Sequence, residues 1–223
     1  MTKTFLSTLF VFSIIAFSTI SKGQTHSYSI MLAGKRIGSI QAVRTVDDNK
    51  AYYDVFSDVN FKVLWKKYNR KTKNLLEKEN GHLVNSRSGI YMNDVLEDSA
   101  YFIKKGEKFY CYRYPDDEFE REFSEITHHT MDLYFKEPVG LEKIYSERFL
   151  AYCKVRPKGL NKYVISLPNG KENVYTYEEG VLVEVFVDRN WFNLTFKRDN
   201  WFCDTLLHLV TESRHLKLKH EVI

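Results

Sequence analysis

The stretch YDVFSDVNFKVLW, residues 53–65, decides the fold class of this chain. Alternate positions, beginning with Tyr53, are Tyr, Val, Ser, Val, Phe, Val and Trp, and most of the positions between them are polar or charged. A repeat of two residues is that of side chains on a β-strand. The pattern therefore predicts a long strand with one buried face.

Similar strands follow along the chain, separated by short turn signals. The turns are predicted at residues 47–49, 80–81, 105–107, 169–170, 179–180 and 188–190. Hairpins are expected for 98–104 with 108–114, and for 171–178 with 181–188. About eleven or twelve strands result, and a sheet of that size must curl, split or close. We therefore expect a mainly β protein: a single, strongly curved antiparallel sheet or half-barrel.

Two segments interrupt the strand pattern. Residues 124–135 (SEITHHTMDLYF) carry apolar side chains at helical spacing, with Thr127 as a candidate cap and Pro138 beyond the end. We expect this segment to form one helix on the concave side of the sheet. Residues 204–215 contain several leucines on one helical face and predict a short C-terminal helix.

The first 23 residues have the features of an export signal. Lys3 precedes an apolar run over residues 5–20, and the small residues Ser21 and Gly23 stand before Gln24. Cleavage there leaves no segment that predicts a transmembrane span, and the expected location is periplasmic or extracellular. The expected organisation is a signal peptide over 1–23, one β-rich domain over 24–198, and a partly helical extension over 199–223.

Net charge argues against a nucleic acid as the main partner. The formal charge of the whole chain is +4, and loss of Lys3 and Lys22 with the signal leaves about +2. Charge is nevertheless uneven, because residues 62–73 are basic and residues 116–125 are acidic. The basic stretch is suited either to anionic headgroups or to a solvated strand edge, where lysines discourage aggregation. The solvated edge is the preferred interpretation.

The sequence offers no recognisable catalytic or metal-binding motif. It lacks a Gly-x-Ser-x-Gly elbow, a phosphate loop and a Gly-x-Gly-x-x-Gly fingerprint. His128 and His129 are adjacent, so on a helix they would point about 100° apart and not toward one ion. We therefore expect no metal and no cofactor. The cysteines Cys111, Cys153 and Cys203 form an odd set, and both buried thiols and a single disulfide remain open.

Several short motifs, taken together, resemble a known family. They are Leu32–Gly38 (LAGKRIG), Leu133–Pro138 (LYFKEP), Tyr145–Phe149 (YSERF), Leu167–Gly170 (LPNG), Asn173–Tyr177 (NVYTY) and Gly180–Val185 (GVLVEV). The set resembles an uncharacterised family of exported proteins of Gram-negative bacteria, a domain of unknown function, over about residues 26–198. The resemblance implies no known activity and no catalytic residues. In architecture the pattern is similar to periplasmic lipoprotein carriers, in which an incomplete barrel around a helix holds an apolar cavity.

Three functional hypotheses follow. The first is a non-enzymatic exported protein that binds a lipid or another amphiphile in the curved sheet. Its expected contacts are Trp65, Tyr134, Phe135, Tyr175 and Tyr177, with Arg148 as a headgroup partner or, alternatively, as a structural anchor. The second is an envelope protein that binds another protein and no small ligand. The third is a hydrolase without a recognised motif. An apolar cavity inside the sheet would favour the first hypothesis, and a filled core with an exposed apolar patch would favour the second.

Overall fold

The computed structural model describes residues 22–63, 65–114, 119–120, 125–189 and 192–199. These residues form one antiparallel sheet of fourteen strands and one short 3₁₀ helix, η1. The elements are β1 (Lys22–Leu32), β2 (Lys35–Asp47), β3 (Lys50–Val63), β4 (Lys66–Glu79), β5 (His82–Met92), β6 (Val95–Lys105), β7 (Lys108–Tyr114), β8 (Phe119–Glu120), η1 (Thr130–Tyr134), β9 (Lys143–Ser146), β10 (Ala151–Pro157), β11 (Lys162–Ser166), β12 (Glu172–Glu178), β13 (Val181–Arg189) and β14 (Phe192–Arg198).

The prediction of a mainly β protein with a single curved antiparallel sheet is confirmed. Neighbouring strands in the sheet are neighbours in sequence, except that β1 also pairs with β14. The sheet ends at β8 on one side and at β9 on the other, and these two ends are not paired, so the sheet is open. The strand number exceeds the expected eleven or twelve. Two of the strands, β8 and β9, have only two and four residues, too few to show alternation.

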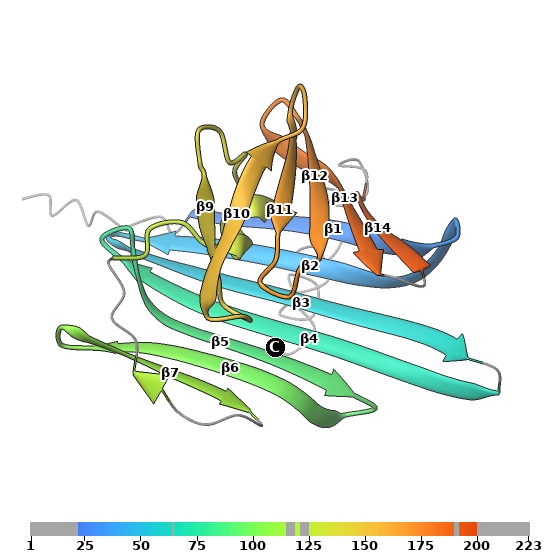
Figure 1. Cartoon of the computed structure of the whole chain (residues 1–223), viewed down its shortest axis with the longest axis horizontal. Coiled ribbons are helices and arrows are strands. Elements are labelled where there is room, and N and C mark those ends of the chain that lie inside the picture. The colour runs from blue at the N-terminus through green and yellow to red at the C-terminus, as the bar shows by residue number, and fades with distance from the viewer. Residues whose placement is uncertain (1–21, 64, 115–118, 121–124, 190–191, 200–223) are drawn as a thin grey trace, which may run out of the picture.

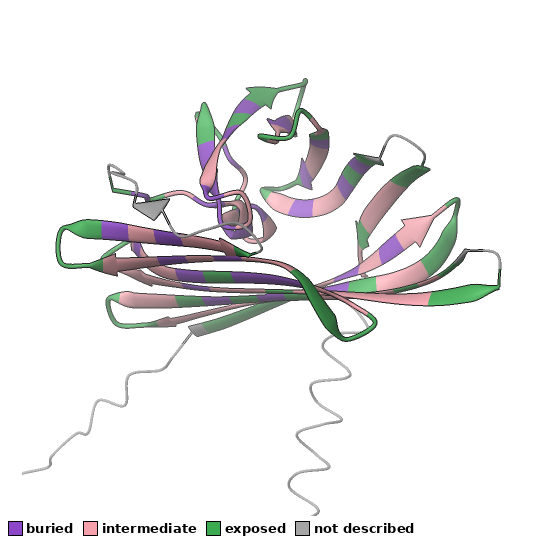
Figure 2. Cartoon of the chain, turned by 60° about the horizontal axis from the view of Figure 1, so that its bottom comes forward, coloured by how far each residue is buried: buried purple, intermediate pink, exposed green. Residues whose placement is uncertain are grey.

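The sheet has a long half and a short half. Strands β1 to β6 contain 11–14 residues, whereas β9 to β14 contain 4–9. The sheet curls at β1 and β14, so that β9 to β13 arch over one face of the long strands (Figures 1 and 2). We call the face beneath this arch the inner face and the opposite one the outer face.

The hydrophobic core lies between the two halves. In β3 the alternation read from the sequence holds, because Tyr53 and Val55 are buried while Asp54 is exposed. Phe102 of β6 meets Tyr145 of β9 across the interior, with ring centroids 5.8 Å apart. Contacts of this kind, which join residues distant in sequence, hold the arch on the long strands through burial of apolar surface.

The predicted helix over residues 124–135 is wrong. Only five of these residues, Thr130–Tyr134, form a helix, and it is of the 3₁₀ type. The reason is that side chains from β12 and from the turn after β9 bind the backbone of this segment. Tyr177 donates a hydrogen bond to the Leu133 carbonyl, and Glu147 accepts one from the Met131 amide. An α-helix that began at the predicted cap Thr127 would need the Met131 amide for its own first hydrogen bond.

Some predictions fall outside the described residues. Residues 1–21 of the predicted export signal over 1–23, and the short helix over 204–215, belong to this group. Strand β1 begins at Lys22, next to the expected cleavage point before Gln24. Among the residues that the structure describes, there is no helix long and apolar enough to span a membrane.

Candidate functional site

Four of the residues predicted to bind a ligand lie together in the interior. They pack against the core between η1 and β12, and they are Tyr134, Phe135, Tyr175 and Tyr177. The Tyr134 ring packs edge-on against Tyr28, with centroids 5.5 Å apart. The Tyr177 hydroxyl donates a 2.9 Å hydrogen bond to the Leu133 carbonyl. Burial raises the pKa of both Tyr134 and Tyr177, so these hydroxyls remain neutral. The structure thus gives these aromatic rings packing roles in the core.

The other two predicted residues lie elsewhere. Trp65 is in the turn between β3 and β4, and it is 77% exposed. Arg148 is in the turn between β9 and β10, where its Nη2 is 3.3 Å from Asp98 Oδ2. Its guanidinium lies over the ring of Phe149, 5.3 Å from the centroid. The six residues therefore do not form one site.

A buried charged cluster fills the space behind η1. His129 is fully buried, and its Nδ1 and Nε2 lie 3.1 Å from Glu147 Oε1 and 3.2 Å from Asp132 Oδ1. These contacts are close approaches and not aligned hydrogen bonds. Lys78 Nζ lies 3.7 Å from Asp132 Oδ2 and donates a 2.6 Å hydrogen bond to the Thr127 carbonyl. The cluster therefore ties η1 and its approach to strand β4 and to the turn after β9.

The charges of this cluster stabilise one another. Burial alone would raise the pKa of the Asp132 carboxyl, but the neighbouring His129 and Lys78 charges and hydrogen bonds hold it below its usual value. Burial lowers the pKa of Lys78, although Asp132 opposes this effect. Because His129 has no exposed surface, a substrate has no access to its ring. We assign the cluster a structural role.

The described cysteines are buried thiols. Cys111 and Cys153 are both buried, and Cys203 lies outside the described residues. Burial, together with the negative charge of Glu147, raises the pKa of the Cys153 thiol to about 11. A thiol with that pKa is almost fully protonated at neutral pH and is a poor nucleophile.

The described part of the chain contains no cluster of three or more His, Cys, Asp or Glu side chains suited to a metal ion.

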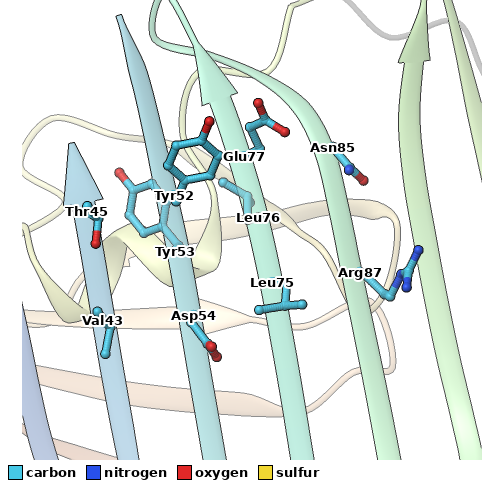
Figure 3. A pocket seen from close by; sticks show the side chains of 10 residues that line it. All are labelled: Val43, Thr45, Tyr52, Tyr53, Asp54, Leu75, Leu76, Glu77, Asn85 and Arg87. Carbon is cyan, nitrogen blue, oxygen red and sulfur yellow. The ribbon is translucent and has the colours of Figure 1, made fainter. Parts of the chain in front are cut away.

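The outer face of the long strands carries a large open hollow. It has a volume of about 400 Å³ and crosses strands β2 to β5 (Figure 3). Its lining residues are Val43, Thr45, Tyr52, Tyr53, Asp54, Leu75, Leu76, Glu77, Asn85 and Arg87. Strand register assigns the hollow to the outer face. Asp54, Leu75 and Arg87 are paired across neighbouring strands, so their side chains share one face. Asp54 and Leu75 are each next in sequence to a buried residue, Tyr53 and Leu76, whose side chain points to the inner face.

A second hollow continues the first across the sheet. It also measures about 400 Å³, extends to β6, and shares Leu75 and Arg87 with the first. Gly89 forms part of its floor, and a Cβ atom there would be 3.2 Å from the ring of Tyr91. The absence of a side chain at Gly89 thus lets the Tyr91 ring lie against the strand. We call the two connected hollows the outer trough.

Side chains in the middle of the outer trough form one row across the sheet. Strand pairing sets the order Val43, Asp54, Leu75, Arg87, Tyr101 and Tyr112. The Arg87 guanidinium lies over the Tyr101 ring, 5.1 Å from its centroid. The rings of Tyr101 and Tyr112 are 5.8 Å apart. The trough therefore combines apolar surface with an arginine stacked on an aromatic ring, an arrangement that can hold an apolar or aromatic group and hydrogen-bond beside it.

The sequence-based prediction missed the outer trough. Its residues occupy the strand positions between the buried ones. Which of them become neighbours across the sheet can be predicted only when the strand register is known. A usable signal exists at Tyr52 and Phe56, which are large and apolar at positions where the alternation of β3 predicts polar residues. Both are exposed in the structure, at 42% and 38%.

Comparison with solved structures supports the fold. The chain is similar to a β-barrel-like protein of the domain of unknown function DUF1849 from Brucella abortus, with a TM-score of 0.55 and 9% sequence identity. The alignment covers 79% of this chain and 95% of the other. At this identity the likeness concerns the fold alone. No curated protein matches the chain.

The family comparison agrees with the resemblance seen in the short motifs. A model of a domain of unknown function, DUF6134, matches residues 28–199. These boundaries enclose nearly all of the strands, from β1 to β14. The chain belongs to the DUF6134 family.

Proposed function

We propose that this protein is an exported, non-enzymatic binding protein of the bacterial envelope, and that it binds a segment of another protein along the outer trough. The observation that carries the proposal is the position of the hollows. The two hollows of about 400 Å³ lie side by side on the outer face, where they share Leu75 and Arg87. This proposal corresponds to the second hypothesis based on the sequence, an envelope protein that binds another protein, and not to the first, a protein that binds a lipid.

The described interior argues for the same choice. A cavity that encloses a small molecule usually measures several hundred Å³. The hollow beside η1 has a volume of only about 40 Å³, and it lies at the surface, with the exposed Val139 in its lining. Bulky rings fill the space above the long strands, including Tyr28, Tyr145 and Phe102, all of which are fully buried.

The shape and chemistry of the outer trough suit an extended polypeptide. It crosses five strands, from β2 to β6, which corresponds to about 19 Å at the usual strand spacing. That length accommodates about six residues of extended chain. Tyrosine and arginine are enriched at the energetic centres of protein interfaces. Arg87 lies where the two hollows meet, and it stacks on Tyr101 at the β6 end of the trough.

A charge-reversed trough tests the proposal. The tagged protein is produced at its natural level in the parent bacterium and purified, and the proteins bound to it are quantified by mass spectrometry. The test variant is Leu75→Asp/Arg87→Glu. The control is Lys158→Glu, which changes an exposed residue in the turn between β10 and β11. We expect at least one bound protein to fall about ten-fold or more with the test variant and to stay constant with the control.

Other outcomes would contradict the proposal. Equal unfolding midpoints of both variants must first show that the fold is intact. A set of bound proteins that the trough variant leaves unchanged would then refute binding at this face. Native mass spectrometry provides a second check. An amphiphile of fixed mass that leaves only on unfolding would support the lipid carrier instead.

A further inference from the structure

The hairpin of β3 and β4 extends beyond the rest of the sheet. Pairing of β3 with β2 stops at Val59, and pairing of β4 with β5 stops at Arg70. Within β3 and β4, residues 60–63 and 66–69 pair with one another, and only Asn69, at the base, also bonds to Asn93 in the turn after β5. Four residues of strand correspond to roughly 13 Å, so the hairpin projects as a two-stranded ribbon (Figure 1). We call residues 60–63 and 65–69 the basic finger.

Among the residues that the structure describes, no ion pair involves the lysines of the basic finger. Lys62, Lys66 and Lys67 are all exposed. The sequence contains no Asp or Glu between Asp58 and Glu77. The whole chain is close to neutral, but the finger is a local concentration of positive charge.

Strand pairing makes this concentration unfavourable for folding. Lys62 lies directly opposite Lys67 in the ladder, and like charges at opposed positions destabilise a sheet. A feature that weakens the fold without local compensation indicates a functional site. An anionic surface that binds the finger would turn this repulsion into attraction.

Aromatic side chains give the finger the second property of a membrane anchor. Trp65 stands in the turn at its tip with 77% of its surface exposed. Behind it, the rings of Phe61 and Tyr68 stack with centroids 5.4 Å apart and planes 15° apart. Tryptophan prefers the boundary between headgroups and acyl chains, and lysines beside it reach the headgroups.

We infer that the basic finger docks this protein on a lipid surface rich in anionic headgroups, with Trp65 at the headgroup level and Lys62, Lys66 and Lys67 against the negative charges. The geometry favours a membrane over a nucleic acid. A projecting tip can enter a lipid surface, whereas single strands bind in basic grooves with several stacking rings. The finger lies at the end of the long strands, away from the outer trough, so the inference does not depend on the proposed function.

Vesicle binding tests the inference. The exported chain from Gln24 is sedimented with vesicles of phosphatidylcholine, either pure or with 30% phosphatidylglycerol. We expect binding only to the anionic vesicles and release at high salt. Lys66→Gln/Lys67→Gln should weaken binding about 25-fold, which is five-fold for each lysine. Trp65→Ser should weaken it about ten-fold through loss of buried apolar surface.

A second pair of lysines provides the matched control. Lys104 and Lys105 adjoin the turn between β6 and β7, and each lies over an aromatic ring of β7. Lys104→Gln/Lys105→Gln removes the same charge and should leave binding unchanged.

In a chain carrying Trp191→Phe and Trp201→Phe, the emission of Trp65 should shift to the blue when anionic vesicles are added.

Four results would overturn the inference. The first is equal binding to neutral and anionic vesicles, and the second is a loss of binding in the Lys104/Lys105 control equal to that in the Lys66/Lys67 variant. The third is an unchanged emission of Trp65 when vesicles are bound. The fourth is binding of a single-stranded oligonucleotide at protein concentrations at which vesicles do not bind. The trough variant leaves the basic finger unchanged. The binding-protein experiment therefore tests only the proposed function, and the vesicle experiment tests only the membrane inference.

Discussion

His129 is fully buried between the two carboxylates of Asp132 and Glu147. Glu147 also accepts hydrogen bonds from Thr130 Oγ1 and the Met131 amide. Removing one partner from a buried ionic cluster leaves the other charges without compensation, and this typically costs more than the cluster contributes. The stability of η1 therefore depends on side chains that are distant in the sequence.

Replacement of Glu147 measures this dependence. We expect Glu147→Gln to lower the free energy of unfolding by about 3 kcal/mol, because it removes the negative charge beside His129. Glu125→Gln is the control, since Glu125 is largely exposed and lies 3.2 Å from His82. This change should cost less than about 1 kcal/mol. Urea unfolding followed by circular dichroism gives both values, and a similar small loss in the two variants would refute the structural role of the cluster.

Asp132 makes stability depend on pH in the acid range. Its pKa in the folded protein is below the usual value, so its contribution is complete above pH of about 4 and is lost as the pH falls through the folded pKa. We expect wild type to lose more stability between pH 7 and pH 3 than Asp132→Asn does. Asp94→Asn is the control, because Asp94 is an exposed partner of Lys71. A pH profile for Asp132→Asn parallel to that of wild type would contradict the assignment.

Cys153 should be unreactive in the folded protein. Its pKa of about 11 leaves roughly one thiolate in a thousand at pH 8. In a Cys203→Ser variant purified without reductant, we expect Ellman's reagent to react slowly with the folded chain and to detect two thiols after unfolding in guanidinium. Detection of no thiol after unfolding would mean that Cys111 and Cys153 form a disulfide, contrary to the structure.

Among the elements, β2 and β3 show the closest backbone approach at a glycine. A Cβ atom at Gly38 would be 2.2 Å from the Asp58 carbonyl oxygen and 2.9 Å from Val59 Cα. Backbone atoms cannot move aside as a flexible side chain can. Gly38 is paired with both β1 and β3, and the register between β1 and β2 shifts beside it, between Ile30 and Met31.

The substitution Gly38→Ala should therefore disturb the sheet. We expect it to lower the free energy of unfolding by about 2 kcal/mol through overpacking. Ser39→Ala, at the exposed neighbouring position, should change it by less than about 0.5 kcal/mol. Thermal unfolding compares the two variants, and an unaffected Gly38→Ala protein would show that the strands are not so close at this point.

The elements also show how far sequence reasoning reaches. Strand β3 was predictable because its alternation reflects a burial pattern that the structure reproduces at Tyr53 and Val55. The helix over 124–135 was not, because Tyr177 of β12 and Glu147 of the turn after β9 bind its backbone, and no local pattern connects them with it. The outer trough depends on register, and Leu75 and Arg87 became neighbours only when β4 and β5 were paired.

At the scale of the whole molecule, the curl of the sheet gives its two faces different roles. The inner face is covered by the arch of β9 to β13 and contains the core. The outer face of the long strands keeps large apolar and aromatic side chains in contact with solvent, including Tyr52 and Phe56. An exposed apolar surface of this kind is typical of an interaction site. The core thus lies on the inner face, and the proposed recognition surface lies on the outer face.

Photo-cross-linking in living cells tests that division most directly. Benzoylphenylalanine replaces Tyr101 in the outer trough or, as a control, the exposed Phe186 on β13. Both positions are aromatic, and both proteins are produced at natural levels in the parent bacterium. The account predicts a discrete cross-linked protein of fixed mass from Tyr101 and none from Phe186. Adducts of equal yield from both positions, or adducts from Phe186 alone, would contradict it.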